Sequence, residues 1–273
     1  MKRKILACLM AALVLGGAPA VQAAAMERGE ISAEELRKMD SFYAESVQAP
    51  HLPWLKAEDC RWAVREDDRL IGWGSYPEIR AEGSAHADVQ RALSRRNRAQ
   101  KERHDAYAAE MERMDDEQKI FGACWEYTVV DRWGRVDDKI ISFALRYGYY
   151  RNGEHLMYSP VTTENITVEK GEPVAIDAVV TGRDRLLHAL AAVFRAKYPQ
   201  QEEFLFAEDA DKALAKYHPR DAWQKTLHWM LNADNDLVVF YNPGDLLPYA
   251  AASFELTIRR SEFPEVFRKG FAD

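Results

Sequence analysis

The stretch DLVVFYNPGDLLPYAAASFELTIRR, residues 236–260, has the pattern of two strands joined by a turn. In its first half Leu237, Val239 and Tyr241 alternate with their neighbours, and the second half repeats the alternation. Each strand therefore has one face available to a core. The connection LLPYAAA, residues 246–252, is apolar where a loop is normally polar. The pattern alone leaves open whether this connection packs against another element or binds a ligand.

The rest of the chain has patterns that are typical of an α+β fold. Apolar residues at helical spacing predict helices over residues 32–47, 84–114, 183–198, 207–217 and 221–231. Aromatic and β-branched runs predict strands at residues 76–80, 121–131, 139–151, 155–168 and 173–177. Turns are expected at Arg132–Arg135, Asn152–Gly153 and Lys170–Gly171. We predict an antiparallel β-meander with a long N-terminal helix, followed by a smaller helix-plus-hairpin module packed on it.

The first 23 residues have the pattern of a cleavable signal peptide. A basic start precedes an apolar run from Ile5 to Leu15, and Val21–Ala23 is a small-x-small cleavage signal. The run is too short for a transmembrane helix, which needs about 20 residues. Cys8 lies within the run with too little hydrophobic sequence before it, so we expect no lipidation. Cleavage near Ala23 predicts a periplasmic or secreted protein without a transmembrane anchor.

Without this leader the chain keeps 34 basic and 44 acidic residues, a formal charge of −10. Such a charge disfavours nucleic acid and anionic membranes as partners and suits a cationic partner. The alternative is that it only keeps an exported protein soluble. A basic run at residues 95–104 of the long predicted helix could contact an anionic wall polymer, or form a solvated face.

Two cysteines, Cys60 and Cys124, remain after cleavage. In an oxidising compartment an even pair indicates one disulfide, which would stabilise the fold by about 4 kcal/mol. The alternative is a nucleophilic cysteine with a histidine partner.

Motifs for common enzyme chemistry are absent from the sequence. There is no H-E-x-x-H, G-x-S-x-G, G-x-x-x-x-G-K-[ST] or G-x-G-x-x-G, and residues 232–237 lack the glycine and glutamate of a calcium loop. We therefore expect no metal and no cofactor. A carboxylate pair for glycan hydrolysis could exist, but no motif locates it.

The order of a long helix, a meander containing ISFALRYGYYRNGEH, a helix and LVVFYNPGDLLPYAAASFELTI resembles the extracellular region of RsiV-type anti-sigma factors. The same modules accompany PdaC-type peptidoglycan deacetylases. In that family a Tyr-rich strand precedes a Gly-Gly-Ala-His turn, where this chain has Asn152-Gly153-Glu154-His155. The family's Ala-Pro-Tyr-Ala-like segment corresponds to Leu247-Pro248-Tyr249-Ala250. The resemblance covers residues 72–260.

The resemblance implies an organisation into a signal peptide (1–23), an N-terminal helical and Trp-rich segment (24–70), a PdaC-like α+β module (71–178) and an RsiV C-terminal-like module (179–273). It also implies that the apolar connection packs on the helix at 183–198. The anti-sigma segment and the deacetylase catalytic domain have no counterpart, so we expect the ectodomain alone, as a secreted module.

The resulting hypothesis is an exported cell-envelope binding protein without catalytic activity, whose ligand is a lysozyme-like protein or peptidoglycan. A ligand face would use Tyr149, Tyr150, His155, Tyr241 and Tyr249. The alternative interpretation is that residues 247–249 belong to the core and that His155 stabilises its turn. The alternative functions are a peptidoglycan-modifying enzyme with a carboxylate pair, and a structural accessory domain.

Overall fold

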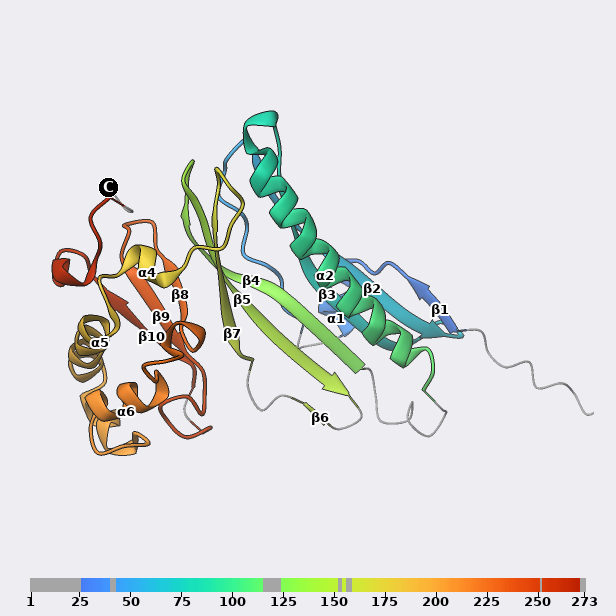
Figure 1. The fold of residues 1–273 in the computed structure, drawn as a ribbon. Helices are drawn as coiled ribbons and strands as arrows, with labels where there is room; N and C mark the ends of the chain where they lie inside the picture. Colours follow the sequence, from blue (N-terminus) through green and yellow to red (C-terminus); the bar gives the residue numbers. More distant parts are fainter. Residues whose placement is uncertain are drawn as a thin grey trace, which may run out of the picture.

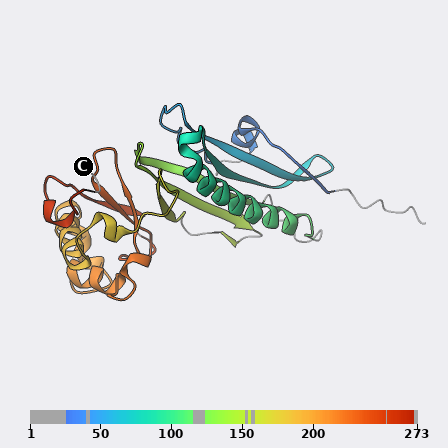
Figure 2. The ribbon, with the colours of Figure 1, turned by 45° about the horizontal axis from the view of Figure 1, so that its top comes forward.

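The computed structural model describes residues 26–39, 43–114, 124–151, 154–155, 159–250 and 252–270, which form two β-sheets with helices packed on them. The larger sheet is elongated, and the smaller sheet with its helices lies at one end of it (Figures 1 and 2). This arrangement confirms the predicted α+β class, with a meander, a long helix and a smaller module.

The large sheet has the order β1-β2-β3-β4-β5-β6, and β7 pairs with β5. Its strands are β1 (Met26–Gly29), β2 (Leu55–Glu66), β3 (Arg69–Ala81), β4 (Cys124–Val136), β5 (Ile140–Arg151), β6 (Glu154–His155) and β7 (Val161–Thr167). All neighbours are antiparallel except β3 and β4. Since β1 and β2 belong to this sheet, the boundary predicted at residue 70 falls inside β3.

The small sheet has the order β10-β9-β8, with β8 (His228–Leu231), β9 (Leu237–Tyr241) and β10 (Phe254–Ile258). The helices of the chain are α1 (Ala33–Met39), α2 (Ala87–Met111), α4 (Ile176–Val179), α5 (Arg183–Lys197) and α6 (Ala210–Tyr217). Short 3-10 helices cover Ser84–His86, Pro199–Phe204, Trp223–Lys225 and Pro264–Val266. The helices predicted from residues 84, 183 and 207 are confirmed.

Helices α1 and α2 cover opposite faces of the large sheet. Leu36 of α1 is fully buried in a cluster with Trp73, whereas Met111 of α2 is buried in a cluster with Trp62. The predicted capping box starts α1, because the Ser32 hydroxyl accepts the backbone N–H of residue 35 at 3.1 Å. The described part of α1 ends at Met39, earlier than the predicted residue 47.

A split in the large sheet explains the position of α2. Strand β3 pairs with β4 only over residues 72–75, so beyond this segment its edge is open. The amide of Asn97 fills the edge: it accepts the Ile79 N–H at 3.2 Å and donates to the Ile79 carbonyl at 2.8 Å. Arg96 donates to the Pro77 carbonyl at 2.9 Å. Helix α2 thus takes the hydrogen-bonding place of a missing strand.

Strand β9 is the centre of the second module and is buried on both faces. Leu237, Val239 and Tyr241 lie in the core cluster that includes α5. Val238 and Phe240 lie in a second cluster that joins the small sheet to β5 and β7. From the sequence, one face of β9 is expected to be buried in a core. Both faces are buried, because the large sheet covers the second one.

Side-chain bonds to the backbone connect the two sheets. The edge of β8 that does not face β9 forms hydrogen bonds through the backbone of Trp229. The Trp229 N–H donates to the Thr163 hydroxyl at 2.8 Å, and its carbonyl accepts from Asn165 at 2.7 Å. Asn242 accepts the Val161 N–H at 2.8 Å and donates to the Val161 carbonyl at 3.1 Å. These bonds satisfy edge groups that would otherwise be buried without a partner.

Three expected elements are wrong. Residues 132–135 lie within β4 rather than in a turn, because Gly134 allows the backbone of β8 to approach it closely. The helix expected at 221–231 is a 3-10 turn followed by β8. The strand expected at 173–177 is reduced to a bridge at Pro173 before α4 begins. The turn at Asn152–Gly153 lies outside the described residues, although β5 and β6 pair on either side of it.

Candidate functional site

The apolar connection between β9 and β10 is half core and half surface. Leu246 and Leu247 are buried in the cluster that includes α5, as expected. Pro248, Tyr249 and Ala250 are exposed, which contradicts the expected burial. The Tyr249 side chain is 61% exposed, and its ring lies so close to Gly244 that an added Cβ there would be 2.8 Å from it. Gly244, with φ of 91°, lets the chain fold back under the ring.

An apolar pocket with a volume of about 520 Å³ opens beside this connection. Its wall comes from α6 and the segments that flank it, and from the start of the connection: Phe206, Ala213, Lys216, Tyr217, Pro219, Thr226, Asp245 and Leu246. The Phe206 N–H donates to the Leu246 carbonyl at 3.0 Å and fixes the two segments together. The pocket is therefore built on bonded segments and suits an apolar side chain.

The polar groups beneath the pocket are engaged with one another. Thr226 donates its hydroxyl proton to the Trp223 carbonyl, so it must accept from Nδ1 of His218, at 2.7 Å. Nε2 of His218 then accepts the phenol proton of Tyr241, at 3.0 Å. Burial lowers the pKa of His218 to about 4 and raises that of Tyr241. This network keeps His218 neutral, so its imidazole brings no charge to the base of the pocket.

The pocket residue Phe206 lies in a stretch of the chain that carries further aromatic side chains and carboxylates, and together with Tyr249 we call these the acidic–aromatic surface. Its aromatic members are Phe204 (57% exposed), Phe206 (46%) and Tyr249. Its carboxylates are Glu202, Glu203, Glu208, Asp209 and Asp211. Arg195 and Lys212 pair with four of these acids, so the group has a net formal charge of −3. Exposed apolar groups with a charged rim are typical of a binding surface.

Among the described residues, the structure does not gather the expected ligand-face side chains at one place. Tyr149 and Tyr150 lie on β5 near β6, whereas Tyr241 is fully buried in the second module. Of His155 only the backbone position in β6 is described. Tyr249 alone of these residues belongs to the acidic–aromatic surface. The missed residues, Phe204 and Phe206, had a visible signal: two phenylalanines inside the acidic run EEFLFAED.

The structure does not contain the expected disulfide between Cys60 and Cys124. Cys60 lies opposite Tyr76 and Cys124 opposite Gly72, on the two sides of β3. Four residues along a strand and two strand spacings place their Cα atoms about 16 Å apart, where a disulfide needs under about 7 Å. Burial, followed by Glu78, raises the pKa of the Cys60 thiol, which works against a nucleophilic role.

Among the residues that the structure describes, the carboxyl group whose pKa is raised belongs to Glu126, which is 2% exposed. Burial raises the pKa of Glu126, and the guanidinium of Arg103, at 2.7 Å, opposes that effect. Glu126 lies between α2 and β4 rather than in an open cleft. In the described ranges no group of three His, Cys, Asp or Glu residues could hold a metal ion. In the same ranges, no helix is both long and apolar enough to cross a bilayer.

No protein-family model and no curated protein matches the sequence. Solved structures of low sequence identity share the fold, including two DUF3298 proteins. A DUF3298 family protein from Pseudomonas aeruginosa PAO1 is 13% identical with a TM-score of 0.54, over 81% of this chain and 97% of that one. A DUF3298 family member from Bacteroides fragilis NCTC 9343 is 12% identical with a TM-score of 0.50, over 90% and 95%. DUF3298 domains occur in PdaC- and RsiV-like extracellular regions, so at the level of fold the resemblance found in the sequence is confirmed.

Proposed function

We propose that this chain is an exported binding protein of the cell envelope, without catalytic activity, and that its ligand is a cationic protein of the lysozyme type. The observation that carries the proposal is the acidic–aromatic surface, in which Phe204, Phe206 and Tyr249 are exposed, Phe206 lines an apolar pocket, and five carboxylates lie close to the two phenylalanines in the chain. The charge of −10 on the chain after the leader, and the fold shared with DUF3298 proteins, support it.

The chemistry of this surface suits a cationic protein better than a small ligand. Aromatic anchors that insert into a partner supply most of the affinity of protein interfaces. Carboxylates around them accelerate the encounter with a cationic partner and select against acidic ones. Phe206 is both exposed and part of the pocket wall, so we expect its contact to contribute most.

The test is a calorimetric titration of the purified chain with a cationic lysozyme at low and at high salt. We expect saturable binding that weakens steeply with salt. Phe206→Ala should weaken it by about tenfold or more, the effect of losing one aromatic anchor. Met39→Ala is the matched control, because Met39 is similarly exposed, at 51%, but lies on α1.

A muropeptide panel and purified peptidoglycan complete the experiment. Saturable binding of a muropeptide without lysozyme binding would replace the ligand class by peptidoglycan. Turnover of the glycan would show instead that the chain is a peptidoglycan-modifying enzyme. Absence of binding to lysozyme at low salt, or equal effects of the two alanine variants, would overturn the proposal.

A further inference from the structure

A second recess lies in the other module, between α2 and the β2–β3 hairpin, and we call it the hairpin groove. Its volume is about 720 Å³, within the usual range for small-ligand sites. Many of its lining residues carry a polar group, among them Tyr76, Glu78, Glu82, Ser94, Arg98 and Lys101, and Cys60 lies with them. It lies on the face of the large sheet opposite to α1, so it is separate from the acidic–aromatic surface.

The wall of the groove is fixed by α2. Residues 90, 94, 97, 98 and 101 follow one another at helical spacing, so a single face of α2 lines the recess. Asn97, 9% exposed, is bonded to both backbone groups of Ile79. These two bonds hold the wall against the floor and prevent the groove from closing or widening freely.

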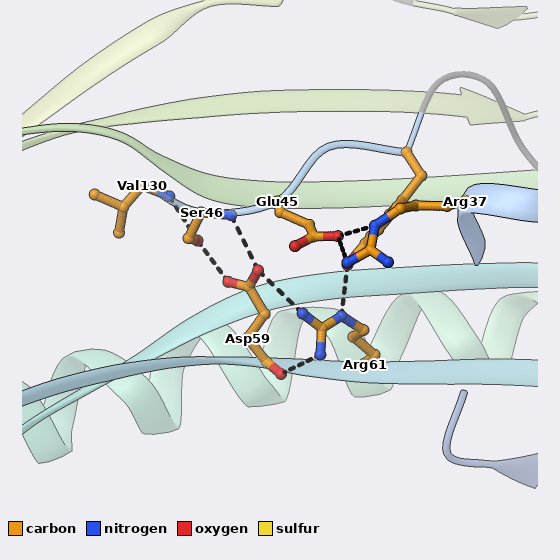
Figure 3. Close-up of polar contacts among 7 residues, drawn as sticks. Arg37, Glu45, Ser46, Asp59, Arg61 and Val130 are labelled. Atoms are coloured by element: carbon orange, nitrogen blue, oxygen red, sulfur yellow. Dashed lines mark hydrogen bonds and ion pairs between the residues drawn. The ribbon is translucent and has the colours of Figure 1, made fainter. Parts of the chain in front are cut away.

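The floor is fixed from its far side. Cys60 points into the groove, whereas its neighbours Asp59 and Arg61 point to the opposite face, as alternation in a strand requires. There Asp59 accepts the Ser46 N–H at 3.0 Å and its hydroxyl at 2.5 Å (Figure 3). Arg61 donates to the Tyr43 hydroxyl at 2.6 Å. Polar groups held on rigid elements bind a ligand with little ordering cost.

The charges of the groove differ from those of the protein as a whole. Arg80 is paired with Glu78 at 2.6 Å, and Lys101 with Asp105 at 2.6 Å. Arg98 is exposed and, among the residues that the structure describes, has no ion-pair or hydrogen-bond partner. An unpaired guanidinium beside a second cation, in a protein with an excess of acid, indicates an anionic ligand group.

The basic residues of α2 therefore have different environments: some pair with acids of the large sheet, and others line the groove. Arg96 and Arg103 point toward the sheet, where they pair with Glu164 and Glu126. Arg95 is exposed and does not line the groove, whereas Arg98 does. Neither interpretation of the run from the sequence, a contact for a polymer or a uniformly solvated face, anticipated this division.

We propose that the hairpin groove binds a small polar ligand that carries a carboxylate or phosphate group, with the anionic group held between Arg98 and Lys101. Ser94 supplies a hydroxyl on the wall, and the Tyr76 phenol supplies a polar group on the floor. Burial raises the pKa of Tyr76 to about 12, so its hydroxyl stays protonated at neutral pH. This site does not depend on the cationic partner proposed for the other module.

The experiment uses the whole chain and two pairs of probes, trialanine against trialanine amide and glycerol 3-phosphate against glycerol. Binding is followed by NMR titration, and by protection of the half-buried Cys60 from iodoacetamide, located by mass spectrometry. We expect the anionic member of at least one pair to bind saturably and to protect Cys60, and its neutral counterpart not to. The pair that responds distinguishes a carboxylate source from a phosphate source.

Arg98→Gln should weaken the binding at least about tenfold, the loss of one charge-assisted hydrogen bond. Arg95→Gln is the matched control, because it removes the same charge from the same helix outside the groove, and it should change the affinity less than about twofold. Equal losses of affinity in the two variants would mean that only the overall positive charge of α2 attracts the probe, and this would overturn the proposal. So would the absence of saturable binding by both anionic probes in the millimolar range.

Discussion

Asn242 tests whether side-chain amides hold the two modules together. It belongs to the stretch that decides the fold and is 8% exposed. Asn242→Ala removes its bonds to the N–H and carbonyl of Val161, and leaves its own backbone bond to Asp245 in place. An unpaired buried backbone group costs about 1–3 kcal/mol. With partial rescue by water in the space vacated, we expect the free energy of unfolding to fall by about 3 kcal/mol.

The measurement is urea unfolding followed by tryptophan fluorescence, with a thermal scan beside it. A loss of about 3 kcal/mol corresponds to a fall in Tm of about 6–12 °C for a chain of this size. Gln224→Ala is the control, because Gln224 is exposed and its amide donates twice to the carboxylate of Asp177. Its free energy of unfolding should change by less than about 0.5 kcal/mol.

The reasoning fails if Asn242→Ala unfolds at the same urea concentration as Gln224→Ala. That result would mean that water satisfies Val161 as well as the amide does. A transition split into two steps would have a different meaning: the modules would unfold separately once the amide is lost, and the bond would act between them as the structure implies.

Three further predictions concern the core. Burial lowers the pKa of His104 to about 3 and of His218 to about 4, so both are neutral when folded. The unfolded chain binds a proton at each histidine below about pH 6.5, so Tm should fall as the pH is lowered from about 6.5 to about 4. Each histidine should lower the free energy of unfolding by up to about 1.4 kcal/mol per pH unit, and a flat profile of Tm against pH would contradict this. Gly134→Ala should cost about 1–3 kcal/mol in urea unfolding, because its Cβ meets the backbone of β8. Unfolding without reductant should release two titratable thiols, Cys60 and Cys124, and a count of zero would restore the disulfide.

The sequence predicted those elements whose periodicity is long and uninterrupted. Helix α2 keeps one buried stripe over 25 residues, apolar at both ends and polar in the middle at Asn97 and His104, and β9 and β10 keep their alternation. Strand β8 was missed because Trp223, Leu227 and Met230 imitate the spacing of a helix. Only its pairing with β9, across a turn where Asn235 has a φ of 63°, makes this segment a strand. Four residues are too few for a period to decide between the two.

The two surfaces differ in how far the sequence could reveal them. The acidic–aromatic surface is local, because Phe204 and Phe206 lie within one acidic run. The hairpin groove is not local. Arg95 and Arg98 have the same chemistry and lie three residues apart, and only the position of the hairpin beside α2 makes one of them a lining residue. A site formed by a helix and a distant hairpin needs the tertiary structure.

Three buried asparagines explain why this fold depends on amides at particular positions. Asn97, Asn165 and Asn242 each form a hydrogen bond to the backbone at a strand edge that no other strand pairs with. Asn97 and Asn242 each need a donor and an acceptor, since they bond to the N–H and the carbonyl of one residue. An aspartate there could only accept and would bury a charge, and a leucine could do neither. The amides therefore close the edges left where β3 splits from β4 and where the two sheets meet.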